Sequence, residues 1–372
     1  MIRDATLEDL DQLVEIENRC FETDRLSRRN FRYMLTKGHA ATLVDEREGQ
    51  VCGYAMVLFS DGTSLARLYS IAVDPDWQGH AIGRALAEAA EQVAVDGECV
   101  SMRLELRPDN AAALQLYHSL GYRQFGYVAD YYEDHADAIR LEKSLAPELT
   151  TDLATVPHYR QSLEFTCGPA ALMMALATLD PQLVLNRKLE LRIWREATTI
   201  YMTSGHGGCG PYGLALAAYH RGFDVEIHVS DPGALFLDSV RSPEKKEVIA
   251  LVQEDFEEEI AELPIRLYHD RVPVARLEAH FAAGAIPLVL VSSYRIYREK
   301  FPHWVVVTGF DERFIYVHDP YIDEEKGKTA SDCINMPILR KDFERMARYG
   351  KSAQRAVLII KRRVEDAGAQ KK

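Results

Sequence analysis

The stretch Gln78-Gly79-His80-Ala81-Ile82-Gly83 decides the fold of the first part of the chain. It follows the apolar run 64–74, which is typical of a β-strand, and it precedes residues 83–96, whose periodicity predicts a helix. Unpaired N–H groups at a helix N-terminus carry partial positive charge, so this turn can bind a pyrophosphate. A glycine turn also fits an ordinary strand-to-helix connection, so residues further along the chain have to decide.

The flanking patterns predict a domain in which helices and strands alternate. Thr6 can cap a first helix, and Asp61-Gly62 marks a hairpin turn. Strands are predicted at 42–47, 51–59, 64–74, 100–107, 122–132 and 137–143. Helices are predicted at 83–96 and 109–119. This order indicates an α/β domain over residues 1–146, with a mixed sheet flanked by helices.

Residues 104–122 carry side chains that suit acyl transfer to an amine. A carboxylate such as Glu105 can take the proton of an attacking amine, and a phenol such as Tyr117 can protonate a departing thiolate. Backbone N–H groups at Ile71, Ala72 and Val73 can hold the carbonyl oxygen. Two alternatives stay open: Tyr117 also fits the core of an amphipathic helix, and Glu105 also fits a surface carboxylate.

Together these residues resemble the Gcn5-related N-acetyltransferase family, and in particular its ribosomal-protein N-terminal acetyltransferases. The resemblance implies acetyl-CoA as cofactor, Tyr117 as general acid, Glu105 as base and a cofactor contact at Asn110. It also implies a pyrophosphate site made by Gln78, Gly79, His80, Ala81, Ile82, Gly83 and Arg84. Ala81 stands where the family usually has glycine, so its methyl group is expected to crowd the phosphate and to weaken cofactor binding.

The pattern restarts after a proline-bearing linker at 147–157. Cys167 opens a predicted helix with Pro169 in its first turn, and the helix dipole there favours a thiolate. Gln161, six residues earlier, can bring an amide donor beside the thiol. Further helices are predicted at 214–221 and 244–262, and strands at 286–292, 303–310, 314–318 and 354–361.

His303 and Asp319 lie on two predicted strands joined by the turn Asp311-Glu312-Arg313. If that turn closes a hairpin, position 305 opposes about 319, which makes His303 and Asp319 diagonal neighbours on one face. His318 then points away. A lone cysteine or histidine is more often a packing residue, but nucleophile, base, orienter and oxyanion donor at this joint spacing indicate a cysteine hydrolase.

Segments 161–171, 303–310 and 317–320 resemble the papain-like peptidases that process bacteriocin leader peptides. The resemblance implies a papain-like α+β domain over 158–362, a tail at 363–372, a Cys167, His303 and Asp319 triad, and an oxyanion hole completed by Gln161. His206 and Cys209 are three residues apart in a glycine-rich loop and are potential metal ligands. Because no second ligand pair accompanies them, we expect this loop to line the substrate site and to bind no metal.

Composition limits the possible functions. A net charge of −13 argues against nucleic-acid binding, and no apolar run approaches the length of a membrane span. Six cysteines without a CxxC pair, and a start without an apolar signal segment, indicate a cytoplasmic protein.

These observations predict a bifunctional enzyme that acetylates a primary amine of a peptide or protein and hydrolyses a peptide amide bond. Three alternatives remain for the division of labour between the domains. The cysteine domain can be a transpeptidase, it can be a non-catalytic peptide-binding module, or the N-terminal domain can be an acetyl-CoA sensor that controls it.

Overall fold

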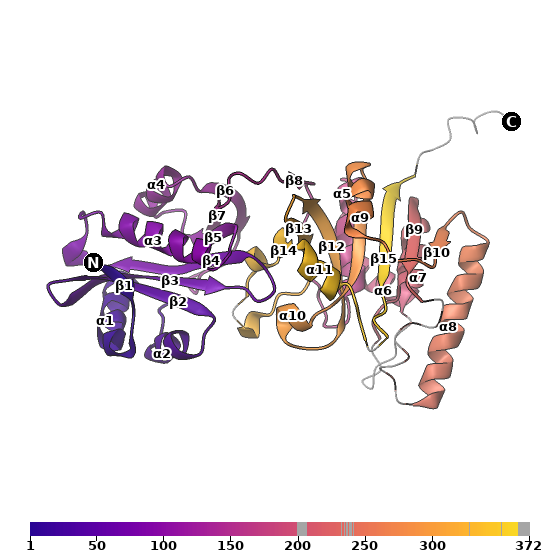
Figure 1. Cartoon of the computed structure of the whole chain (residues 1–372), viewed down its shortest axis with the longest axis horizontal. Coiled ribbons are helices and arrows are strands. Elements are labelled where there is room, and N and C mark those ends of the chain that lie inside the picture. Colours follow the sequence, from indigo (N-terminus) through magenta and orange to yellow (C-terminus); the bar gives the residue numbers. More distant parts are fainter. Residues whose placement is uncertain are drawn as a thin grey trace. The chain divides into compact units, whose positions relative to one another are not determined.

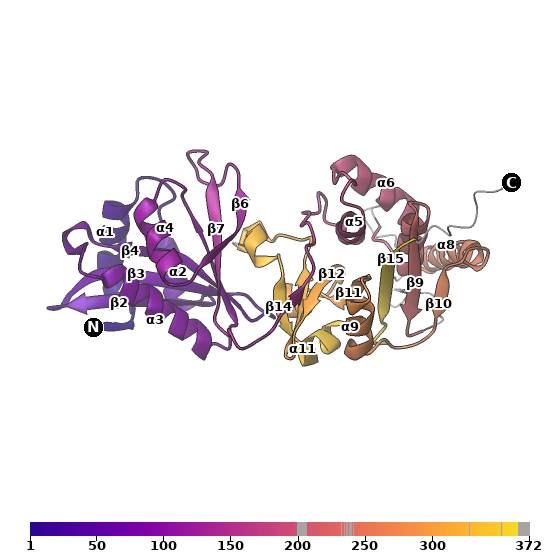
Figure 2. The same cartoon turned by 90° about the horizontal axis from the view of Figure 1, so that it is seen from above.

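The computed structural model describes residues 1–198, 207–231, 233, 235, 237, 240, 242–326, 328–350 and 352–363 (Figures 1 and 2). The chain divides into two compact units, Met1–Leu149 and Thr150–Lys372. One part of the predicted linker is not a linker in the structure. Strand β8 (Asp152–Leu153) pairs with a strand of the second unit, where Leu153 lies opposite Gly309.

The first unit is built on a seven-stranded sheet in the order β1-β2-β3-β4-β5-β7-β6. Its strands are β1 (Ile2–Asp4), β2 (Ala40–Arg47), β3 (Gln50–Phe59), β4 (Leu65–Val73), β5 (Ser101–Leu106), β6 (Arg123–Val128) and β7 (Ala138–Ser144). The helices are α1 (Leu10–Cys20), α2 (Arg28–Thr36), α3 (Ile82–Asp96) and α4 (Ala111–Ser119). Strands β4 and β5 are parallel and the other neighbouring pairs are antiparallel, so the predicted mixed sheet is confirmed.

Strand β3 separates two hydrophobic cores because its side chains alternate between the faces of the sheet. Tyr54 and Met56 pack with α1 and α2, whereas Ala55 and Val57 pack with α3. In Figure 1 these two helix pairs, α1 with α2 and α3 with α4, cover opposite faces. Thr6 caps the first helical turn as predicted, but α2 was not predicted.

The second unit has a sheet in the order β10-β9-β15-β11-β12-β13-β14, with β8 added at β12. These strands are β9 (Phe223–Val229), β10 (Arg266–Tyr268), β11 (Ile286–Ser292), β12 (Pro302–Phe310), β13 (Phe314–His318), β14 (Met336–Leu339) and β15 (Ala356–Arg362). Its α-helices are α5 (Cys167–Leu179), α6 (Arg187–Ala197), α7 (Pro211–Tyr219), α8 (Pro243–Ala261), α9 (Val274–Ala282), α10 (Tyr294–Tyr297) and α11 (Arg340–Met346). Figure 2 shows α5 and α6 on one side of this sheet and α9 and α11 on the other.

The β12–β13 hairpin forms with the predicted register. Val306 lies opposite His318 and Val307 opposite Val317, and a bulge follows before Gly309. This register sets His303 and Asp319 beside each other. Among the described residues no helix has both the length and the apolar character needed to cross a membrane.

Candidate active sites

The first candidate site lies where β4 and β5 separate. The two strands pair only from Leu65 opposite Ser101 to Arg67 opposite Arg103, and the ladder ends there. The later part of β4, with Ile71, Ala72 and Val73, therefore has β3 as its partner on one edge only. A gap of this kind leaves backbone groups of β4 available to an extended ligand.

The turn after β4 is shaped for close approach of a ligand to the backbone. Gly79 has φ +82° and open space where a Cβ would stand. The N-terminus of α3 has no side-chain cap, so its first N–H groups remain available for an anion. The His80 side chain contacts the backbone instead: its Nδ1 lies 3.1 Å from Trp77 O and 3.0 Å from Gln78 O. The Gln78 side chain donates from Nε2 to Val73 O at 3.3 Å.

Ala81 is the strained position of this turn. Its φ of 58° lies in the left-handed region, at the N-cap of α3. A side chain in this conformation costs about 1–2 kcal/mol relative to glycine, so alanine at this position strains the backbone. Crowding of the phosphate by the methyl group remains a prediction. The neighbouring Ile82 is buried, and Gly83 faces Val73 and Leu116.

Two further predicted cofactor residues have structural partners. Asn110 caps α4, its Oδ1 accepting a hydrogen bond from Ala113 N at 3.1 Å, and Arg84 donates to Ser119 Oγ. Both side chains thus have a role in holding the first unit together. Contact with the cofactor remains a prediction for each.

Glu105 is not a surface carboxylate. Its side chain is 4% exposed, and Oε2 accepts a hydrogen bond from Arg67 Nε at 2.8 Å. The other oxygen, Oε1, is buried without a hydrogen-bond partner. Arg140 lies directly across on β7, and burial lowers the pKa of this guanidinium. One carboxylate oxygen is therefore held by Arg67, whereas the other is buried without a hydrogen-bond partner.

Tyr117 lies in the core that α4 forms with the sheet. It is 4% exposed, and its ring packs edge-to-face on Tyr122 with centroids 5.3 Å apart. Burial raises the pKa of the Tyr117 phenol above its ordinary value. The hydroxyl is thus kept protonated, which is the form a proton donor needs.

The second candidate site joins the start of α5 to the β12–β13 hairpin. Cys167 is the first residue of α5 and is 9% exposed. His303 Nε2 lies 2.6 Å from Asp319 Oδ1, and both side chains are buried. Tyr297 OH donates to Asp319 Oδ2 at 2.7 Å, and the Tyr321 N–H donates to Oδ1 at 2.8 Å. The predicted pairing of His303 with Asp319 is therefore confirmed.

The electrostatics of this pair favour a protonated histidine. Burial alone would lower the pKa of His303, but the charge and hydrogen bond of Asp319, together with a hydrogen bond to Cys167, raise it to about 10. For Asp319, burial opposes ionisation, but the charge of His303 and its hydrogen bond hold the pKa of the carboxyl below its usual value. Since Nε2 faces Asp319, the other ring nitrogen is the one that serves Cys167.

Gln161 sits close in sequence to the thiol but does not point its donors outward. Its Nε2 donates to the carbonyls of Leu163 and Glu164 at 2.8 and 3.2 Å, and its Oε1 is buried without a hydrogen-bond partner. The oxyanion role of Gln161 therefore remains a prediction. His318 points elsewhere, as expected, because Nε2 contacts Val156 O at 2.9 Å.

Sequence reasoning missed two supporting residues. Tyr297, on the four-residue helix α10, orients Asp319, and Glu190, on α6, holds the segment before the thiol. Glu190 is fully buried and accepts hydrogen bonds from Ser162 N at 2.7 Å and Tyr159 OH at 3.0 Å. A four-residue helix gives no periodic signal, but an acidic residue on the apolar side of 187–197 was a visible clue.

The expected substrate-lining loop is described only in part. His206 lies outside the described residues. Cys209 is buried, and its Cβ lies 3.3 Å from where a Cβ on Gly168 would stand. Burial raises the pKa of the Cys209 thiol far above its ordinary value, so this cysteine is a packing residue of the α5 environment.

Comparison with known proteins agrees with this division. Residues 10–122 match the Acetyltransferase (GNAT) family, and residues 156–361 match the Peptidase_C39 like family. The putative [ribosomal protein bS18]-alanine N-acetyltransferase of Bacillus subtilis is 28% identical over 138 residues, which are 37% of this chain and 89% of that protein. An uncharacterized N-acetyltransferase of Methanocaldococcus jannaschii is 32% identical over 149 residues, covering 38% of this chain and 90% of the relative.

A solved structure is similar over the same region. The crystal structure of the ribosomal-protein-S18-alanine N-acetyltransferase from Escherichia coli has 28% sequence identity and a TM-score of 0.36, and the match covers 39% of this chain and 93% of that one. The chain thus belongs to the acetyl-CoA-dependent GNAT acetyltransferases through its first unit and to the Peptidase_C39 like family through its second.

Proposed function

We propose that this acetyltransferase modifies the α-amine of a protein or peptide and that its second unit hydrolyses a peptide amide bond with Cys167. The arrangement of Cys167, His303 and Asp319 carries the proposal, because a buried nucleophile, base and orienter in mutual contact have a chemical use beyond packing. The names of the relatives, alanine N-acetyltransferases of a ribosomal protein, support an α-amine as acceptor.

In the first unit, acetyl-CoA when bound supplies the acetyl thioester. The uncapped start of α3 and the turn at Gly79 would hold the pyrophosphate, and the gap beside Ile71 to Val73 would orient the carbonyl oxygen. Glu105 would take the amine proton through its free oxygen Oε1, directly or through water, and Tyr117 would protonate the departing thiolate.

In the second unit the Cys167 sulfur forms a bond to the carbonyl carbon of the peptide, and its proton resides on His303. When the tetrahedral intermediate collapses, the C–N bond breaks and His303 gives the proton to the leaving amine. His303 then takes a proton from water, whose oxygen attacks the thioester. The C–S bond breaks, Cys167 regains its proton, and a carboxylic acid is released.

A peptide library incubated with the full chain tests both reactions at once. In water enriched in oxygen-18, hydrolysis adds one labelled oxygen to the new carboxyl group, and acetylation adds an acetyl mass only when acetyl-CoA is present. Both changes are expected by mass spectrometry. Joined peptides without the label would show transpeptidation instead. No cleavage, with Cys167 no more reactive than the other cysteines, would make the second unit a peptide-binding module.

A further inference from the structure

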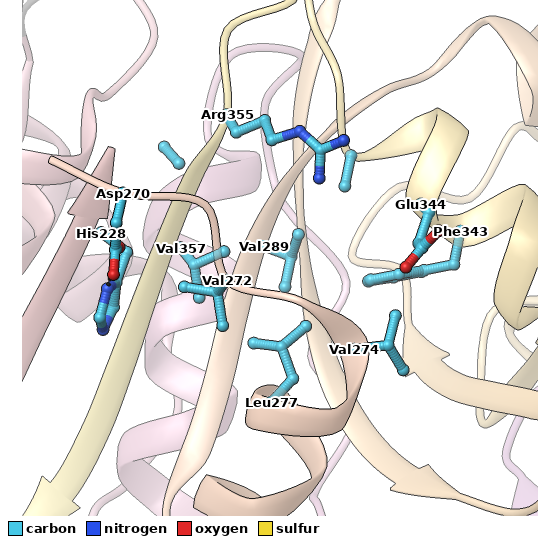
Figure 3. Close-up of a pocket in the computed structure, with 12 residues that line it drawn as sticks. His228, Asp270, Val272, Val274, Leu277, Val289, Phe343, Glu344, Arg355 and Val357 are labelled. Carbon is cyan, nitrogen blue, oxygen red and sulfur yellow. Dashed lines mark hydrogen bonds and ion pairs between the residues drawn. The ribbon is translucent and has the colours of Figure 1, made fainter. Parts of the chain in front are cut away.

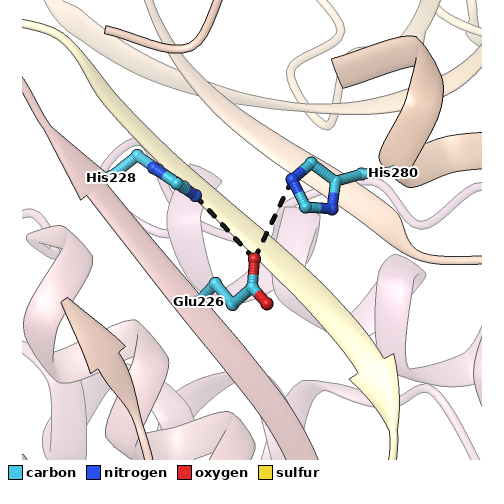
Figure 4. A group of neighbouring side chains, drawn as sticks. All are labelled: Glu226, His228 and His280. Atoms are coloured by element: carbon cyan, nitrogen blue, oxygen red, sulfur yellow. Dashed lines mark ion pairs between the residues drawn. The ribbon is translucent and has the colours of Figure 1, made fainter. Parts of the chain in front are cut away.

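A second group of chemically active side chains lies in the C-terminal unit, apart from Cys167. Glu226 and His228 are two residues apart on β9 and share one face of the strand, and His280 reaches them from α9 (Figure 4). One potential ligand atom from each residue lies within 4.8 Å of the other two. The Nε2 atoms of His228 and His280 are 3.9 and 3.8 Å from Glu226 Oε2.

The His228 ring is held in the orientation a ligand needs. Its Nδ1 lies 2.7 Å from Asp270 Oδ1, so the tautomer with its hydrogen on Nδ1 donates to that carboxylate. In the neutral ring, Nε2 then carries the lone pair that faces Glu226 and His280. Tyr268, the cross-strand neighbour on β10, stacks on the ring at 4.7 Å and 9° and fixes its plane. A histidine with one nitrogen on a carboxylate and the other facing further ligand atoms is the usual geometry of a metal ligand. Arg276 Nη2 lies 3.5 Å from the same Nε2.

Three acceptor atoms therefore face one another across distances too long for hydrogen bonds. Such an arrangement is stabilised by a shared cation. In a tetrahedral zinc site with bonds of about 2.0–2.1 Å, neighbouring ligand atoms lie about 3.3 Å apart, so each side chain here would move by roughly half an ångström.

We propose that Glu226, His228 and His280 form a site for a transition-metal dication, with Zn²⁺ as the matching ion. Two imidazoles and one carboxylate suit zinc better than calcium or magnesium, which prefer oxygen ligands. Within the described part of the chain the set provides three protein ligands, which leaves one position of a tetrahedral ion for water. His280 is 20% exposed at its side chain, which gives the ion a way in.

Nearby charges set the affinity of this site. Lys361 Nζ lies 2.8 Å from Glu226 Oε1 and Arg266 Nη1 lies 3.5 Å from it, so only Oε2 remains for the ion and Glu226 would bind through one oxygen. Arg276 Nη2 lies 2.9 Å from His228 Nδ1, and its other nitrogen, Nη1, pairs with Asp270. These cations oppose a dication, so we expect micromolar rather than nanomolar binding.

A small cavity adjoins His228 and its partner Asp270 (Figure 3). It has a volume of about 20 Å³, and His228 and Asp270 line it together with apolar side chains such as Val272 and Val357. This volume admits a single water molecule, and Asp270 supplies an acceptor for it. The cavity thus provides room for a solvent molecule behind the ring that Asp270 orients.

Zinc titration of the full chain tests the site. The titration is made in a Cys167→Ala background, so that the thiol beside His303 does not bind the ion. Calorimetry is expected to show one Zn²⁺ equivalent whose affinity falls at least 10-fold in His280→Ala. His220→Ala is the matched control, because His220 also faces a glutamate, Glu259 at 3.1 Å, but among the described residues it belongs to no group of three potential ligands. This control should leave the affinity unchanged.

A second readout separates metal binding from misfolding. Saturating Zn²⁺ should raise the melting temperature of the second unit by about 5 °C, and His280→Ala or Glu226→Gln should abolish the rise while the circular dichroism spectrum stays unchanged. Equal zinc affinity in the parent, His280→Ala and Glu226→Gln proteins would overturn the proposal. Absence of zinc binding by the parent up to 100 μM, well above the expected micromolar range, would overturn it as well.

Discussion

The two units build their candidate sites from different materials. In the first unit the features that we propose to bind acetyl-CoA are backbone features: the uncapped start of α3, the left-handed turn and the gap between β4 and β5. In the second unit side chains make the candidate site, and His303 and Asp319 are in direct contact. A backbone site tolerates many side-chain changes, whereas a side-chain triad depends on each of its members.

The supporting contacts differ in the same way. Glu105 and Asn110 already serve the structure, as the partner of Arg67 and as the cap of α4. Asp319 receives hydrogen bonds from Tyr297 and from the backbone of Tyr321, which fix the carboxylate for His303. The side chains around Asp319 are therefore held in place by hydrogen bonds, whereas we expect the site in the first unit to be completed by acetyl-CoA.

The largest expected effect tests whether the triad acts as a unit. Cys167→Ala should lower peptide cleavage by about 10⁴-fold or more, and adding His303→Ala should lower it little further, because the nucleophile and base work together. Acetyl transfer should stay within twofold of the parent. Cys209→Ala, the buried neighbour of Gly168, should keep cleavage activity. Kinetics with one cleaved peptide check all three variants, and residual cleavage in Cys167→Ala would place the chemistry elsewhere.

In the first unit, removal of one hydroxyl should matter less. Tyr117→Phe should lower kcat of acetyl transfer about 10- to 1000-fold, because the departing thiolate loses its proton donor, while the Kd of acetyl-CoA stays nearly unchanged. Tyr122→Phe, which alters the ring packed against it, is the control and should keep kcat. If Tyr117→Phe turns over like the parent, Tyr117 is only a core residue.

The pH dependence of peptide cleavage should show whether Asp319 controls the protonation of His303. Because the pKa of His303 is raised to about 10, the imidazolium beside Cys167 is present at neutral pH and is lost as pH rises through that value. Cleavage should therefore decline only at strongly alkaline pH. In Asp319→Asn the charge that raises the pKa is gone, so this alkaline limb should move toward the ordinary pKa of histidine. An unmoved limb would mean that Asp319 does not control His303.

The sequence predicted residues that a local hairpin brings together, but it did not predict residues that only tertiary packing brings to the site. The pairing of His303 with Asp319 was predicted because the hairpin turn at 311–313 fixes a register, and register determines which side chains meet. Tyr297 and Glu190 escaped prediction because they come from α10 and α6, whose contacts with the site depend on tertiary packing alone. Nothing local in 187–197 or 294–297 specifies where these helices lie.

In the first unit the sequence predicted the order of elements well. Strands β2, β3 and β4 begin and end within two residues of the predicted runs, because alternating apolar residues and glycine turns are strong local signals. The ion pair between Glu105 and Arg67 was not foreseen. It joins β5 to β4, and a pair of charges on neighbouring parallel strands has no signature in the linear pattern.

The two units should also unfold separately. Fragments 1–147 and 152–372 keep β8 with its own sheet, so each should give one cooperative transition in calorimetry. Acetyl-CoA at about 100 times its Kd should stabilise the first fragment by about 2.7 kcal/mol and leave the second unchanged. A fragment that aggregates while the full chain stays folded would show that the units share part of their core.

The smallest expected effect concerns the strained turn. Ala81→Gly relieves a left-handed φ that costs about 1–2 kcal/mol, but it also adds about 0.4–1 kcal/mol of chain entropy to the unfolded state. The net result should be a first unit more stable by up to about 1.6 kcal/mol, measured by urea unfolding. Ala85→Gly, one turn into α3, is the matched control and should destabilise by about 0.5–1 kcal/mol.

Cofactor binding then separates strain from crowding at this turn. If the Ala81 methyl group also presses on the pyrophosphate, Ala81→Gly should tighten acetyl-CoA binding severalfold, whereas Ala85→Gly should not. Tighter binding without added stability would indicate crowding alone, and added stability without tighter binding would indicate strain alone. If Ala81→Gly behaves like Ala85→Gly in both measurements, Ala81 does not adopt a left-handed conformation in solution. Acetyl-CoA binding would then depend less on the backbone of this turn than we propose.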